Sequence, residues 1–219
     1  MIVTIDGPAG SGKSTAARRL AERLGFEFLD TGAMYRAVAL KSLASGIDVG
    51  DSERVAQLAG EMQIDALGPI VRADGRDVTS AIRTPEVTIA ASRVAAIPAV
   101  RAAMVRLQRE ATEGRNVVSE GRDQGTVVFP DAECKFFVTA DARERARRRQ
   151  LELAEQGKEI AFEDQLRQIL ERDTRDETRE TAPLRAADDA IRIDTSQLSP
   201  DETVKRMEAV VREKLGRSR

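Results

Sequence analysis

Short runs of apolar residues alternate along the chain with longer stretches in which every third or fourth residue is apolar. Residues 2–5 form the first short run, and their β-branched side chains predict a buried strand. In the stretch 14–24 apolar residues lie four apart, which predicts a helix that ends at Gly25. Strands that alternate with helices imply a parallel sheet. Further strands are predicted at residues 26–29, 116–119, 134–138 and 190–194, and further helices at about 33–45, 52–62, 98–113 and 162–174, with others that begin at Pro85, Ala142 and Pro200.

Residues 62–82 break this pattern. Asp74 and Gly75 stand between two β-like runs, and an Asp-Gly pair in that position is a strong short-range signal for a hairpin. We therefore predict a small antiparallel insertion of two or three strands outside the main sheet, which would form a second lobe.

Candidate chemistry begins directly after the first predicted strand. The residues there match the pattern G-x-x-x-x-G-K-[ST], in which glycines let successive N–H groups point inward as an anion nest at a helix N-terminus. Lys13 would bring its charge to the β- and γ-phosphates of a nucleotide, and the Ser14 hydroxyl can bind Mg²⁺. A glycine-rich turn that matches by chance is the alternative, which the strand before and the helix after it disfavour. The predicted loop comprises Gly7, Pro8, Ala9, Gly10, Ser11, Gly12, Lys13, Ser14 and Thr15.

Two further groups of polar residues follow predicted strands. Parallel sheets bind ligands at the carboxyl ends of their strands, so the loop 30–32 and the segment 120–123 are candidates to reach substrate or metal. Arg36 lies one helical turn from the first of these loops. Tyr35 beside it is equally typical of core packing.

Other candidates lie on predicted helices, where each has a plain structural interpretation. Spacing alone favours surface positions for Ser92 and Arg101. Arg172, Asp176 and Arg179 lie four and three residues apart, so a helix would place them on one face, either to bind a ligand or as an intrahelical salt-bridge ladder.

The segment that begins at Ala142 is very rich in arginine, and Arg148 is one of these arginines. Such a run is typical of a solvated helix face. Two charged helices joined at Gly157 can also form a lid that closes arginines over a transferring phosphate. We favour the lid, because the phosphate loop needs charge from elsewhere in the chain.

Composition narrows the classes of function. The 219 residues, 41% of them hydrophobic, are enough for one main domain with an insertion. A net charge of −2 argues against a general binder of nucleic acid or acidic membranes. The chain has no histidine, which excludes an imidazole base, and its one cysteine, Cys134, excludes a disulfide framework and fits core packing. Phosphoryl transfer needs neither residue. No signal peptide or bilayer-spanning run is evident, so we expect a cytoplasmic protein.

Over nearly its whole length the chain resembles the bacterial cytidylate kinase family. The phosphate loop alone would indicate only a superfamily, whereas the Gly-Arg-Asp segment and the β insertion are far more specific. Some members carry Asp or Ser where this chain has Glu120 and Thr31, and both changes keep the functional group. The resemblance rests on residues 5–15, 29–36, 91–96, 120–132 and 171–173.

The resemblance implies an α/β fold of the P-loop NTPase type with a five-stranded parallel sheet, a small antiparallel β insertion and a helical lid. It implies transfer of the γ-phosphoryl group of ATP to CMP or dCMP, with Mg²⁺. We expect these small molecules as partners, with no nucleic acid or membrane, and a monomer, because nothing in the sequence demands more. It divides one kinase domain, 1–219, into a core at about 1–35, 98–145 and 180–219, a monophosphate-binding lobe at about 36–97 and a lid at about 146–160.

The resemblance also assigns residues. The phosphate loop would hold ATP, Ser14 would bind Mg²⁺ with Glu120 acting through water, and Asp123 would accept a hydrogen bond from the amino group of cytosine. The candidate catalytic residues are Lys13, Arg122 and Arg172, with Arg148 as our first candidate among the lid arginines. CMP would be held by Thr31, Tyr35, Arg36, Ser92, Arg101, Arg122, Asp123, Arg172, Asp176 and Arg179.

Two other functions remain open from the sequence. The first is a kinase of the same fold that acts on UMP, AMP or a hydroxy acid, which the β insertion and Asp123 disfavour. The second is a nucleotide switch that binds partners, although the chain lacks the Asn-Lys-x-Asp motif that reads guanine. A nucleic-acid-binding ATPase fits poorly with the net charge.

Overall fold

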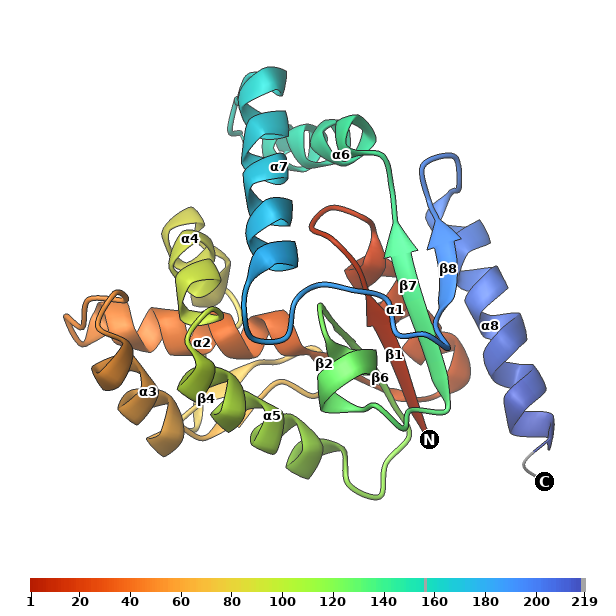
Figure 1. Ribbon diagram of the computed structural model, residues 1–219, viewed down its shortest axis with the longest axis horizontal. Helices are drawn as coiled ribbons and strands as arrows, with labels where there is room; N and C mark the ends of the chain where they lie inside the picture. The colour runs from red at the N-terminus through yellow and green to blue at the C-terminus, as the bar shows by residue number, and fades with distance from the viewer. Residues whose placement is uncertain (156, 218–219) are drawn as a thin grey trace. The chain divides into compact units, whose positions relative to one another are not determined.

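The computed structural model describes residues 1–155 and 157–217 (Figure 1). Five strands form a parallel sheet in the order β2-β6-β1-β7-β8, and three short strands form a separate antiparallel sheet in the order β3-β4-β5. The predicted α/β fold class is therefore confirmed. The chain divides into two compact units, Met1–Phe26 with Val118–Arg219, and Glu27–Val117.

The first unit is built on the centre of the parallel sheet. Strands β1 (Ile2–Asp6) and β7 (Cys134–Thr139) pair in parallel with Thr4 opposite Lys135, and β7 pairs in the same sense with β8 (Ile191–Asp194). Both faces of β1 and β7 are buried, as expected for a parallel sheet covered by helices. Strand β6 spans Val117–Gly121.

Two helices of the first unit have ends where the sequence predicts them. Helix α1 (Lys13–Leu24) ends at Gly25, which adopts a left-handed conformation with φ 67°. Helix α8 (Pro200–Arg217) begins at the predicted residue with a capping box, in which the Ser199 N–H donates to the Glu202 carboxylate and the Glu202 N–H donates to the Ser199 hydroxyl. Figure 1 shows α8 alongside β8.

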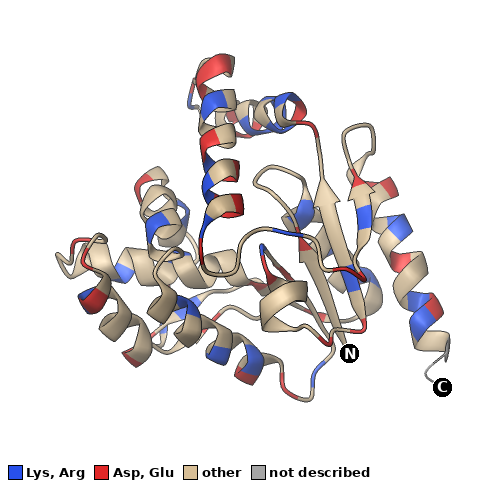
Figure 2. Cartoon of the chain, in the orientation of Figure 1, with Lys and Arg blue, Asp and Glu red and all other residues tan. Residues whose placement is uncertain are grey.

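The arginine-rich segment forms helix α6 (Ala142–Glu155), which packs against α7 (Phe162–Thr178). Figure 2 shows both helices studded with charges of each sign. Helix α7 extends four residues beyond its predicted end at Thr174. The spacing of apolar residues in 162–174 predicts that Leu166, Ile169 and Leu170 are buried. Leu170 is instead 48% exposed, because the buried face of α7 follows Gln165, Ile169 and Asp173. The predicted lid also includes Gln156, which lies outside the described residues.

The second unit holds four helices and the β insertion. Helix α2 packs against α4, and α3 packs against α5. The predicted hairpin at Asp74-Gly75 is confirmed, with Asp74 at φ 50°, and a short 3₁₀ helix follows at Ala81–Arg83. The elements are β2 (Glu27–Asp30), α2 (Thr31–Ala44), α3 (Ser52–Glu61), β3 (Ile64–Asp65), β4 (Arg72–Ala73), β5 (Arg76–Asp77), α4 (Pro85–Val94) and α5 (Pro98–Thr112).

Two boundaries differ from the sequence prediction, and both concern strand ends. No loop separates β2 from α2, because Asp30 ends the strand and its side chain accepts the N–H of Ala33 as the helix cap. Glu120 and Gly121 belong to β6 and do not lie past its end. Arg122 and Asp123 follow the strand directly and lead into a π-helical turn, Gln124–Val128, that the apolar pattern did not predict.

In the described part of the chain, no single helix has the length and hydropathy to cross a bilayer. Only α4 and α5 taken together reach that length and composition, and they meet at a bend of 100°.

Candidate functional site

The phosphate loop lies between β1 and α1, and its glycines are required by geometry. Gly7 has φ 153°, and a Cβ there would lie 2.0 Å from the carbonyl oxygen of Val138. Gly10 and Gly12 have φ of 76° and 83°, in the left-handed region. The loop thus leads into the N-terminus of α1, where backbone N–H groups favour an anion. This is the arrangement that the sequence motif predicts.

Lys13 is the first residue of α1 and is 5% exposed. Its Nζ donates to the carbonyl of Pro8 at 3.2 Å and lies 3.9 Å from Oε2 of Glu120. Burial lowers the pKa of Lys13 to about 7, and the charge of Arg122 acts in the same direction, while Glu120 opposes it. An anionic phosphate beside Nζ would stabilise the charged form of this side chain.

Ser14 and Glu120 supply the oxygen atoms of a candidate Mg²⁺ site. The Ser14 hydroxyl donates to Oε1 of Glu120 at 2.8 Å. Among the residues that the structure describes, no three His, Cys, Asp or Glu side chains gather as a metal cage. A hydroxyl and a carboxylate nevertheless fit Mg²⁺ in kinases, which takes one or two protein ligands and completes its shell with phosphates and water.

The residues after β6 form ion pairs with α7 and its end. Nε of Arg122 donates to Oδ2 of Asp176 at 2.9 Å, and Nη2 of Arg179 lies 4.0 Å from Oδ1 of Asp123. Arg179 is the residue that follows α7 and is not on its helical face. Asp176 and Arg179 therefore each pair with a residue that follows β6, a contact that an intrahelical ladder alone does not include. Arg172 lies on α7 one turn before Asp176.

Electrostatics in this cluster follow from the pairing. Burial alone would raise the pKa of Asp176, but the guanidinium groups of Arg122 and Arg172 outweigh it and lower that pKa. Burial likewise acts to lower the pKa of Arg122, and the Asp176 carboxylate overcomes it and raises the pKa. Both side chains are therefore held in their charged forms.

In the second unit, the Asp30 carboxylate at the end of β2 contacts two arginine side chains. Nη2 of Arg36 donates to both carboxylate oxygens of Asp30, at 3.1 and 3.2 Å, and Nη2 of Arg83 lies 3.8 Å from Oδ2. Thr31, next to Asp30, is buried. The sequence indicated Arg36 but not Arg83, since Arg83 lies in a 3₁₀ turn with no periodic signal.

Arg101 corrects the expectation of a surface position, because it is only 3% exposed. Its Nη1 donates to the carbonyl of Ala95 at 3.2 Å, and its guanidinium lies 5.7 Å from the centroid of the Tyr35 ring. Ser92 on α4 and Tyr35 on α2 are half-buried. Helical spacing could not reveal this, since Arg101 faces the other helices of its unit.

Sequence reasoning missed Arg145 as a partner of the phosphate loop. Its Nη1 donates to the carbonyl of Ala9 at 3.1 Å, its Nη2 lies 2.6 Å from Oδ2 of Asp173, and its Nε donates to Ala140. This buried side chain therefore joins α6, α7 and the loop. In the sequence it is one arginine of a run, and no pattern there distinguishes it from its neighbours.

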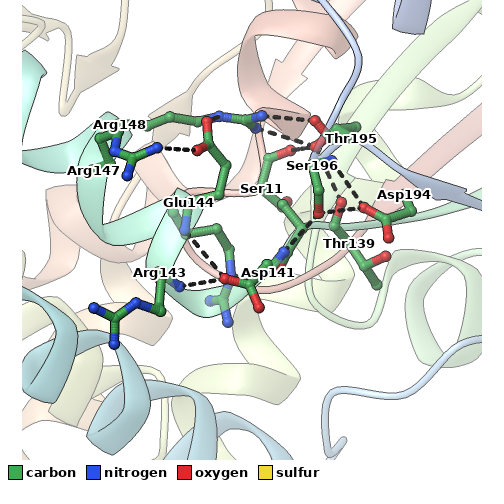
Figure 3. A network of polar contacts seen from close by, with 12 residues as sticks. Ser11, Thr139, Asp141, Arg143, Glu144, Arg147, Arg148, Asp194, Thr195 and Ser196 are labelled. Atoms are coloured by element: carbon green, nitrogen blue, oxygen red, sulfur yellow. Dashed lines mark hydrogen bonds and ion pairs between the residues drawn. The ribbon is translucent and has the colours of Figure 1, made fainter.

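Arg148, expected to be catalytic, is held beside the same loop (Figure 3). Its Nε donates to Oε1 of Glu144 at 3.0 Å, and its Nη2 donates to the carbonyl of Thr195 at 2.7 Å. The Thr195 hydroxyl in turn donates to the carbonyl of Ser11 at 3.0 Å. The arginine is thus connected to the phosphate loop through Thr195, which the sequence did not single out.

A glycine loop between a parallel strand and a helix, a buried lysine beside it, and a cluster of paired arginines and carboxylates define a P-loop protein that binds nucleotide phosphates. Comparison with known proteins narrows the class. Residues 3–213 match the family model described as cytidylate kinase, and the chain belongs to this family.

Individual relatives agree with the family match. The chain is 50% identical over 222 residues to a cytidylate kinase of Solibacter usitatus, with 100% of this chain and 95% of the relative covered. It is 48% identical over 210 residues to a cytidylate kinase of Caldanaerobacter subterraneus, with 96% and 94% covered. It is also 48% identical to a bifunctional pantoate ligase/cytidylate kinase of a Synechococcus species, of which it covers 45%.

Proposed function

We propose that this protein transfers the γ-phosphoryl group of ATP to CMP or dCMP, which yields ADP and CDP or dCDP for pyrimidine nucleotide metabolism. The observation that carries the proposal is the contact of two buried side chains, Lys13 and Glu120, with the Ser14 hydroxyl at the phosphate loop of a chain that belongs to the cytidylate kinase family. An oxygen of the acceptor phosphate attacks the γ-phosphorus, and the bond from that phosphorus to the β–γ bridging oxygen breaks.

We assign the donor to residues Gly7–Thr15. The N–H groups of the loop and the ammonium of Lys13 hold the β- and γ-phosphates and stabilise the charge on the moving phosphoryl group. Ser14 and Glu120, the latter through water, would hold Mg²⁺, which supplies charge neutralisation when bound. Arg148 and Arg172 add positive charge at the transferred group.

We assign the acceptor to the residues that the family resemblance implies. Arg36 and Arg122 hold its phosphate, because a planar guanidinium matches phosphate oxygens in pairs. Asp123 accepts a hydrogen bond from N4 of cytosine, and Arg101 and Ser92 pair with the ring acceptors. The remaining contacts to phosphate and ribose come from Thr31, Tyr35, Arg172, Asp176 and Arg179.

The remaining assignments concern partners and location. We propose ATP and CMP or dCMP as small-molecule partners, with no nucleic acid or membrane, and a monomer as the acting form. The cytoplasm, which supplies ATP and free nucleotides, is the proposed place of the reaction.

The experiment that tests the proposal is ADP formation from MgATP with CMP, dCMP, UMP, AMP or no acceptor, measured side by side. Strong turnover with the cytidine nucleotides and near silence without an acceptor is the expected result. Equal ADP release in every reaction would indicate an ATPase or a switch.

The cytosine assignment has its own test. The variant Asp123→Ala should reduce kcat/KM for CMP by about 10²- to 10³-fold, in the range that an unpaired buried polar group costs, while the KM for ATP stays unchanged. Unchanged discrimination between CMP and UMP in this variant would remove Asp123 from the cytosine site.

A further inference from the structure

Asp6 is the last residue of β1, directly before the phosphate loop, and it is 4% exposed. Its Oδ1 accepts the backbone N–H of Gln124 and its Oδ2 accepts the N–H of Gly125, each at 2.8 Å. Both oxygens of one buried carboxylate therefore bind consecutive amides of one turn. None of the assigned roles in binding ATP or CMP involves this side chain.

The turn that Asp6 holds is the continuation of Arg122 and Asp123. The carbonyl of Asp123 accepts the N–H groups of Val127 at 2.9 Å and Val128 at 3.2 Å, so the π-helical turn begins directly after this residue. Such turns recur at functional sites. A shift of the Gln124 and Gly125 amides would therefore move the backbone from which Arg122 and Asp123 project.

Close packing leaves the turn little freedom to shift. A Cβ on Gly125 would lie 3.0 Å from the Thr4 hydroxyl oxygen and 3.2 Å from Cδ of Lys135. The Ser119 hydroxyl also donates to Oε1 of Gln124 at 2.8 Å. The backbone at Gly125 approaches β1 and β7 so closely that the carboxylate and the two amides are held in register.

The buried charge of Asp6 is costly for the fold, which argues that it serves the site. Burial raises the pKa of Asp6 to about 7; the two amide hydrogen bonds offset part of that effect, the nearby Asp123 adds to it and Arg122 opposes it. Lys135, whose side chain borders Gly125, is bound to Asp189 at 2.9 Å and to Pro130. A carboxylate is the one side chain of this size that accepts from both amides at once.

We propose that Asp6 is a positioning residue of the acceptor site, which fixes the direction of Arg122 and Asp123 by holding the amides of Gln124 and Gly125. The inference rests on the proposed function, in which those two residues bind CMP. The ionised carboxylate accepts both amides, whereas a protonated one presents an O–H to one of them and loses that contact.

The test compares Asp6→Asn with wild type in steady-state kinetics with CMP and UMP. The amide side chain keeps the size but turns an NH₂ group toward one backbone N–H. We expect KM for CMP to rise by about tenfold, the equivalent of one lost charge-assisted hydrogen bond, and the CMP/UMP ratio of kcat/KM to fall, with KM for ATP within about twofold of wild type. Adding Asp6→Asn to Asp123→Ala should lower the CMP/UMP ratio no further, since both act on one contact.

Gly125→Ala disturbs the contact between the Asp6 carboxylate and the two amides by a change in the turn and not in the carboxylate. This variant tests the role of the contact if Asp6→Asn does not fold. Val211→Ala, which removes buried volume on α8, is the matched control for a loss of stability alone, and it should lower Tm without changing the CMP/UMP ratio.

A pH series supplies a readout that a purely structural role would not move. Because Asp6 loses its proton near pH 7, KM for CMP in wild type should rise as the pH falls from 8 to 6. The rise should be larger in wild type than in Asp6→Asn. The comparison between the two proteins removes the contribution from titration of the phosphate of CMP, which is the same in both. A wild-type protein whose rate of ADP formation does not increase with CMP would overturn the proposed function. Active wild type together with folded variants of unchanged CMP/UMP ratio, or a pH series that matches that of Asp6→Asn, would overturn this inference alone.

Discussion

Arg122 and Asp176 form an ion pair between the residue that follows β6 and helix α7, with Nε 2.9 Å from Oδ2. The two residues are 54 positions apart in the sequence. The pair holds a guanidinium in its charged form at the place where an acceptor phosphate is proposed to bind.

Replacement of Asp176 by Asn should lower the free energy of unfolding at pH 7 by about 1–3 kcal/mol, because it leaves the charge of Arg122 without its carboxylate. The pKa of Asp176 is lowered in the folded state, so its stabilisation is present above the unfolded value of 3.8 and is lost as the pH falls through the folded value. The difference between wild type and variant in urea denaturation should therefore shrink from pH 7 toward pH 3. A difference that grew on acidification would contradict this account.

Lys13→Met should reduce kcat by about 10²- to 10³-fold, the usual cost of removing one charge from a transition-state site. Stability should not suffer, because the lowered pKa of Lys13 shows that the folded protein disfavours its charged form at neutral pH. Circular dichroism melts and single-turnover phosphoryl transfer measure the two effects. A variant with full activity would remove Lys13 from the mechanism.

Arg148→Ala should lower kcat more than it raises KM for ATP, because its charge is proposed to act on the transferring phosphoryl group. Arg147→Ala is a matched control on the same helix, since that side chain is 69% exposed and contacts Glu144. Equal rates in both variants would show that Arg148 only holds the segment around Thr195.

Arg145 and Asp173 should be energetically coupled. A double-mutant cycle with Arg145→Gln and Asp173→Asn should give a coupling of about 1–3 kcal/mol in unfolding, as residues in one buried network do. KM for ATP should rise in Arg145→Gln, because Arg145 also holds the Ala9 carbonyl. The exposed pair Arg167–Asp164 serves as the control and should show no coupling above error.

Cys134 should not react with a thiol reagent in the native protein. It is buried, and burial raises the pKa of its thiol, so little thiolate is available at neutral pH. Labelling should follow unfolding in urea and slow when nucleotides stabilise the fold. Rapid labelling of the native protein would contradict the buried position.

Local signals determined much of the fold before any tertiary information. The phosphate loop, the Asp74-Gly75 hairpin and the Ser199–Glu202 capping box each depend on residues a few positions apart, whose backbone preferences act wherever the chain goes. The helix end at Gly25 belongs to the same kind of signal. Resemblance to a family added the roles of the site residues, which stay predictions.

Tertiary structure alone decided which charged residues are buried and which residues they form ion pairs or hydrogen bonds with. Arg101 is buried and Leu170 is half exposed, against their helical spacing, because neighbouring helices determine which face is covered. Asp6 binds an amide 118 positions away, and no periodicity in the sequence records such a contact. Short-range patterns reflect the backbone preferences of adjacent residues, whereas the pairing of buried charges depends on which distant segments the sheet brings side by side.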